Sequence, residues 1–102
     1  MRHKVLIRLI KFVLSYKLNI NQMAKLLKSN GEVVPNVSIS TLKQMQELVG
    51  GYIELCYLKS GEILVVNEEG LLNQLPHNEQ ASELQGHPLV GDVIVCSASE
   101  LN

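Results

Sequence analysis

The stretch VGGYIELCYLKSGEILVVNEEGLLNQLPHN, residues 49–78, decides the fold that this sequence predicts. Residues 52–59 alternate between two faces, which is typical of a β-strand. Ser60 and Gly61 then form a tight turn, and residues 62–67 return as a run rich in β-branched side chains, as in a central strand. A β-hairpin therefore lies at the centre of the predicted domain.

A second, smaller hairpin precedes it. Residues 23–27 form a short apolar strand, and residues 29–31, Ser-Asn-Gly, are a turn of the kind that joins antiparallel strands. Residues 32–34 return along the first strand. We expect Pro35 and Asn36 to end this returning strand, because proline cannot donate a backbone hydrogen bond to a sheet.

One short helix lies between the two hairpins. Thr41 and Gln44 have the spacing of a capping box at a helix start. Apolar residues then recur at helical spacing as far as Val49, and Gly50 suits the left-handed conformation that ends a helix. A helix of about two turns is not stable in isolation, so packing must hold it in place.

The residues after residue 70 complete the domain. Residues 71–75 are compatible with either a short strand or irregular structure, and residues 79–84 with one helical turn capped by Asn78. Residues 92–97 form the last strand. The prediction is an α+β fold, in which an antiparallel sheet of four to five strands packs against one short helix, with a basic helix at the N-terminus.

The chain of 102 residues divides into an N-terminal segment, residues 1–22, and one domain, residues 23–102. Residues 1–17 hold five basic residues and no acidic one. Three interpretations of this segment are open: a helix that packs on the domain or forms an oligomer, an upstream extension before a start at Met23, or a basic amphipathic helix on a membrane surface. The segment is too short and too charged to span a membrane.

Composition excludes several kinds of function. From residue 18 onward the chain has four basic and ten acidic residues, and the whole chain has no Trp, so we do not expect it to bind nucleic acid. Cys56 and Cys96 lie in apolar runs and are expected to be reduced thiols of a protein in the host-cell cytoplasm; a cross-strand disulfide would need an oxidising compartment. No motif predicts a metal site, a cofactor or a nucleophile–base pair, so we do not expect an enzyme.

A candidate ligand site lies where the central hairpin ends. Amide, carboxylate and aromatic side chains gather there, and glycine lets a backbone amide approach a ligand. The alternative is that the same residues are ordinary turn and cap residues. Lys43, near a helix start, is a candidate for holding phosphate. The predicted binding residues are Tyr52, Glu54, Asn67, Glu68, Glu69, Gly70, His77, Asn78 and Lys43.

Three spaced motifs, VGGYIELCYL at 49–58, VVNEEGLLNQLPHN at 65–78 and LVGDVIVC at 89–96, resemble a small domain-of-unknown-function family found in phages, prophages and plasmids. The resemblance covers residues 23–98 and implies this fold and a mobile-element setting. That setting favours a non-catalytic anti-defence protein, a homo-oligomer that sequesters a small nucleotide-like signal. The alternative is a protein-interaction module that inhibits a host protein through its acidic face or an exposed strand edge.

Overall fold

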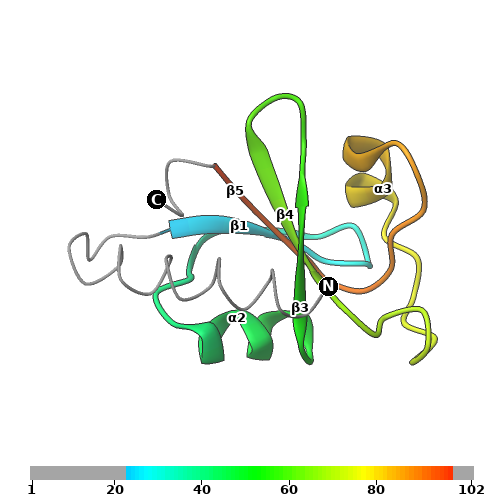
Figure 1. The fold of residues 1–102 in the computed structure, drawn as a ribbon, viewed down its shortest axis with the longest axis horizontal. Helices are drawn as coiled ribbons and strands as arrows, with labels where there is room; N and C mark the ends of the chain where they lie inside the picture. Colours follow the sequence, from blue (N-terminus) through cyan, green and yellow to red (C-terminus); the bar gives the residue numbers. More distant parts are fainter. Residues whose placement is uncertain (1–22, 98–102) are drawn as a thin grey trace.

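A computed structural model of the protein describes residues 23–97, and the predicted N-terminal helix lies outside them. The fold is α+β, as predicted: five antiparallel strands form one sheet in the order β2-β1-β5-β4-β3, with two helices (Figure 1). Neither described helix is long and apolar enough to cross a bilayer. The elements are β1 (Met23–Leu27), β2 (Val33–Ser38), α2 (Leu42–Val49), β3 (Ile53–Tyr57), β4 (Glu62–Asn67), α3 (Glu79–Gln85) and β5 (Val93–Ser97).

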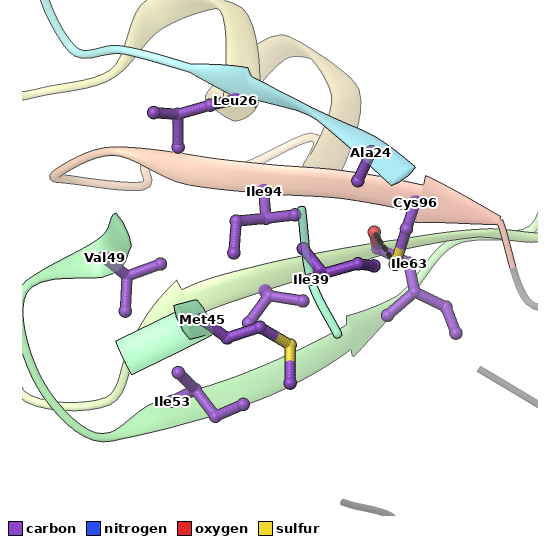
Figure 2. Packing of buried hydrophobic residues seen from close by; sticks show 10 residues of the cluster. Ala24, Leu26, Ile39, Met45, Val49, Ile53, Ile63, Ile94 and Cys96 are labelled. Atoms are coloured by element: carbon purple, nitrogen blue, oxygen red, sulfur yellow. Dashed lines mark hydrogen bonds between the residues drawn. The ribbon is translucent and has the colours of Figure 1, made fainter. Parts of the chain in front are cut away.

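The central strands of the sheet are buried on both faces. On one face, Met45 and Val49 of α2 pack over Ile53 and Ile94 in the cluster that we call the α2 core (Figure 2). On the other face, Ala81 of α3 packs on a second cluster, the α3 core. Because both faces of β4 and β5 are covered, the sequences of these two strands are nearly continuous apolar runs without alternation. The buried members of the α3 core are Leu27, Leu64, Val66, Ala81, Val93 and Val95.

The alternation predicted for β3 is confirmed. Ile53 and Leu55 pack in the α2 core, whereas Cys56 and Leu58 pack against the α3 core. This strand therefore contributes to both layers, and among the described strands it pairs with β4.

The predicted end of the second strand is wrong. β2 continues past Pro35 to Ser38, because Pro35 occupies a position of this edge strand that faces away from β1, where no N–H is needed, and a β-bulge follows it. Ala24 pairs with Val37 and Leu26 with Val34, so two residues of β2 lie opposite one residue of β1. Asn36, with φ 59°, takes the left-handed conformation in this bulge.

The helix ends follow the sequence rules. Thr41 and Gln44 form the predicted capping box, and Gly50 has φ 83° at the end of α2. α3 is longer than the predicted single turn and reaches Gln85, with Asn78 as its cap. Residues 68–74 form successive turns, so this stretch has the irregular structure that the sequence allowed and does not form the alternative short strand.

Candidate functional site

The first predicted site residue, Asn67, lies at the end of β4 and is 8% exposed. Its side-chain Nδ2 donates to the carbonyl oxygen of Val49 at 3.1 Å, and its Oδ1 accepts from the backbone N–H of Glu69 at 2.8 Å. The amide thus ties the end of α2 to the turn after β4. A ligand would have to compete with these two bonds, so the ligand-binding role of Asn67 stays a prediction.

Asn78 is even more deeply placed, at 1% exposure. Its Nδ2 donates to the carbonyl oxygens of Leu27 and Gly91, both at 2.8 Å, and its Oδ1 accepts from the N–H of Ala81 at 3.1 Å. Every hydrogen-bonding atom of this side chain therefore has a backbone partner. The predicted helix cap is confirmed, and the chain uses the same residue to join β1, α3 and the turn before β5.

Residues 68–75, which we call the dileucine loop, are held in a defined shape. The N–H of Glu68 donates to the carbonyl oxygen of Tyr52 at 2.8 Å, and the N–H of Leu75 donates to Gly70 at 3.0 Å. Gly70 is buried, and a Cβ there would lie 2.9 Å from Cγ2 of Val90, so only glycine fits without movement of the neighbour. The loop is thus anchored at both ends and at its centre.

Two leucines project from this anchored loop. Leu71 is 78% exposed and Leu72 is 81% exposed, the highest values among the large apolar side chains of the described chain. Leu75, by contrast, lies against Gly91. The sequence analysis did not select Leu71 and Leu72; the available signal was a pair of leucines in a stretch with neither strand nor helix periodicity.

The remaining predicted residues lie at different places in the fold. Tyr52 is 59% exposed and adjoins the dileucine loop through its carbonyl oxygen, and His77 is exposed beside the loop's end. Glu54 is half-buried on β3. Lys43 lies in the first turn of α2, at the opposite end of that helix from Val49, which contacts Asn67. The structure therefore keeps Lys43 apart from the other candidates.

A groove of about 520 Å³ lies between the β3–β4 hairpin and the end of α3. Gln85, on its wall, has a buried Oε1 with no hydrogen-bond partner in the described part of the chain, while its Nε2 lies 2.9 Å from Nε2 of His87. Carboxylates of Glu62 and Glu83 flank the groove, with Leu58 and Leu84 as apolar walls. Sequence reasoning did not find this groove, since it joins segments distant in the chain.

The chemistry of the described residues is limited to binding groups. No cluster of three or more His, Cys, Asp or Glu within residues 23–97 is placed to hold a metal ion. Cys56 is a free thiol, and the Sγ of Cys96 lies 3.8 Å from the carbonyl oxygen of Ile63. Burial, and secondarily the nearby Glu54 carboxylate, raises the pKa of the Cys56 thiol above its ordinary value.

Comparison with known proteins identifies a family for this domain. Residues 23–101 match the family model described as Domain of unknown function (DUF3846). No curated protein matches the chain, and no solved structure matches it. Because the family model covers most of the chain, the protein belongs to the DUF3846 family.

Proposed function

We propose that this protein is a non-catalytic protein-interaction module, and that the dileucine loop is its binding tip. The observation that carries the proposal is the exposure of Leu71 and Leu72, at 78% and 81%, on a loop whose backbone is fixed by hydrogen bonds. Single exposed apolar residues are common on protein surfaces, whereas adjacent ones form a contiguous apolar patch of the kind that marks interaction sites.

The anchoring favours binding because little freedom is lost when the tip meets its partner. Asn67 fixes the start of the loop and Gly70 holds its centre against Val90. A loop that is ordered before binding avoids the entropic cost of becoming ordered on contact. Each leucine side chain would bring roughly 1.5–3 kcal/mol if fully buried in a partner's pocket.

The surrounding charge indicates what kind of partner fits. Glu68 and Glu69 precede the two leucines, and the sequence from residue 18 onward is acidic. We therefore expect the partner, a host protein if the chain comes from a mobile element, to offer an apolar pocket with Lys or Arg at its rim. Such a rim would speed association at low salt and make the rate sensitive to ionic strength.

The test is a comparison of immobilised wild-type protein with a Leu71→Ser, Leu72→Ser double variant. A host protein retained by the wild type and lost by the variant, and then shown to bind as a purified component, supports the proposal. Leu84→Ser is the matched control, since Leu84 is an exposed leucine on α3 outside the loop. Equal retention by wild type and double variant would reject the tip as the binding element.

A second proposal is sequestration of a small nucleotide-like signal by an anti-defence protein. The observation that favours it is the groove of about 520 Å³, in which Gln85 has a buried amide oxygen without a partner among the described residues. A rotation of the Gln85 side chain would present that oxygen to a donor group on a base or ribose in the groove. Two carboxylates, of Glu62 and Glu83, line the groove beside the single cation of Lys59, and this balance disfavours a phosphate and ranks the proposal second.

Native mass spectrometry with a panel of cyclic nucleotides and cyclic ADP-ribose isomers tests this second proposal. Whole ligand masses that bind, and that heat releases intact, would support sequestration without cleavage. A Gln85→Leu variant should then bind less, because it removes the amide oxygen but keeps much of the side-chain volume. Binding unchanged by Gln85→Leu would place any ligand elsewhere.

A further inference from the structure

The turn between β1 and β2 carries the dipeptide Asn30-Gly31, the one place in the sequence where a glycine follows an asparagine. Both residues are exposed. Because glycine has no Cβ, its backbone nitrogen can approach the side-chain carbonyl carbon of the residue before it. A Cβ built on Gly31 would meet no atom within 4 Å, so the surrounding described residues leave this approach open as well.

The hydrogen bonds of this turn polarise the Asn30 side chain. Its Oδ1 accepts from the backbone N–H of Glu32 at 2.9 Å. A donor on this oxygen also stabilises the negative charge that develops there when the adjacent carbon is attacked. The attacking group would be the backbone nitrogen of Gly31, which donates to the carbonyl oxygen of Lys28 at 3.0 Å. That bond lies at an exposed hairpin tip, where local opening lets water replace it.

We propose that Asn30 is a site of spontaneous deamidation in the folded protein, with water as the co-reactant. The backbone nitrogen of Gly31 bonds to Cγ of Asn30 and gives up its proton through solvent. The Cγ–Nδ2 bond breaks, and Nδ2 takes up a proton and leaves as ammonia. Water then opens the cyclic imide at one or the other of its carbonyl–nitrogen bonds, which leaves aspartate or isoaspartate at residue 30.

The two products affect the hairpin differently. Aspartate keeps an oxygen that accepts from the N–H of Glu32, and it adds a negative charge to the turn. Isoaspartate leads the main chain through the side-chain carbon, so it lengthens the backbone before Gly31 and displaces the carbonyl group of that residue. This carbonyl oxygen accepts from Nε2 of Gln80 at 2.8 Å. Isoaspartate therefore weakens a contact between α3 and the β1–β2 hairpin.

The other asparagines of the described chain are less suited to this reaction. Asn67 and Asn78 are buried, and their side-chain amides donate to backbone carbonyl oxygens. Asn36 and Asn73 are followed by valine and glutamine, whose side chains hinder the approach of the backbone nitrogen. The reaction should therefore be concentrated at Asn30, which lies outside both the dileucine loop and the groove beside α3.

The β3–β4 hairpin has the same kind of turn without the asparagine, and it offers a matched position for a test. The N–H of Leu58 donates to the carbonyl oxygen of Glu62 at 2.9 Å, and the N–H of Gly61 donates to Leu58 at 3.1 Å, which is the pattern of the first hairpin. Ser60 occupies the position that corresponds to Asn30, and its Oγ accepts from the N–H of Glu62 at 3.3 Å.

Peptide mass mapping of the purified full chain, incubated folded in neutral and mildly alkaline buffer, tests the proposal. We expect residue 30 to gain about 1 Da ahead of every other asparagine, because an amide becomes a carboxylic acid. The gain should be faster at the higher pH, since the attacking nitrogen must lose its proton, and chromatography should separate an aspartyl from an isoaspartyl peptide. An equal gain at Asn36 or Asn73, or a rate that does not change with pH, would contradict the mechanism.

A double variant, Asn30→Ser with Ser60→Asn, transfers the dipeptide to the second hairpin. The mass gain should then move to residue 60, and a residue 60 that stays intact would contradict the role of the turn. The wild-type chain in guanidinium chloride supplies the time reference, because Asn30 is free of the turn's hydrogen bonds there. If Asn30 stays intact in the folded protein over the time in which the unfolded chain deamidates, the proposal is overturned.

Discussion

The side-chain amide of Asn78 donates a 2.8 Å hydrogen bond to the carbonyl oxygen of Leu27, which lies 51 residues earlier in the sequence. A residue that looks from the sequence like a local helix cap therefore also fastens the end of β1. The same Nδ2 reaches Gly91 before β5, so one buried side chain connects three parts of the domain.

Replacing Asn78 with Asp should be strongly destabilising, by about 3 kcal/mol or more, because a buried carboxylate would face the carbonyl oxygens of Leu27 and Gly91. The penalty should shrink in acid, where a protonated carboxyl can donate one bond. Urea unfolding at neutral and low pH measures both effects. Asn78→Ser, which keeps a capping oxygen, is the milder control; equal stability of wild type and Asn78→Asp would show that these bonds contribute little.

Gly91 and Gly61 form a matched pair for testing close packing. Both have positive φ, at 77° and 95°, but a Cβ on Gly91 would lie 2.8 Å from Cδ1 of Leu75, whereas a Cβ on Gly61 would meet nothing within 4 Å. Gly61→Ala should cost about 1–2 kcal/mol from backbone conformation alone. Gly91→Ala should cost roughly 1–3 kcal/mol more from overpacking. Thermal or urea unfolding of the two variants measures this difference in the free energy of unfolding. Equal destabilisation by the two substitutions would show that the close contact with Leu75 adds no cost.

The Cys56 thiol should react slowly with iodoacetamide near neutral pH. Burial first, and the Glu54 carboxylate second, raise its pKa above the ordinary value of 9.0, so little of the reactive thiolate is present. Glu54→Gln removes the second cause and should increase the labelling rate at pH 8. The control is Glu47→Gln on α2, which should leave the rate unchanged. An unchanged labelling rate in the Glu54→Gln variant would show that burial alone raises the pKa of the Cys56 thiol.

Leu71→Ser and Leu72→Ser should leave folding stability within about 0.5 kcal/mol of wild type, because neither side chain is buried within the domain. Leu75→Ser should be clearly destabilising, since Leu75 packs against Gly91 and Gly70. Chemical denaturation of the three variants measures this contrast. Destabilisation by Leu71→Ser would mean that the leucine supports the fold rather than a binding surface.

The elements of the fold could be predicted because their signals are local. The capping box of Thr41 and Gln44, the left-handed Gly50 and the alternation of β3 each arise within a few neighbouring residues. The end of β2 could not be predicted, because the sheet tolerates Pro35 only at an edge-strand position that faces away from β1. That outcome depends on strand pairing, which no short stretch of sequence specifies.

The candidate site was harder to predict than the fold. Asn67 and Asn78 are polar residues beside turns, and such residues are equally typical of ligand contacts and of structural hydrogen bonds. The tertiary structure shows that their side-chain amides donate to the carbonyl oxygens of Val49, Leu27 and Gly91. Exposure also depends on tertiary structure. Leu71, Leu72 and Leu75 are the same residue type within one loop, yet only Leu75 packs against the domain.

The position of β5 has a consequence for how the domain is assembled during synthesis. β5 lies between β1 and β4, so it is the strand that joins the β1–β2 hairpin to the β3–β4 hairpin, although it leaves the ribosome after both of them (Figure 1). Until Val93–Ser97 emerges, the nascent chain holds two separate hairpins with their apolar inner edges uncovered. The domain therefore completes its sheet only after β5 has emerged and entered the middle of it.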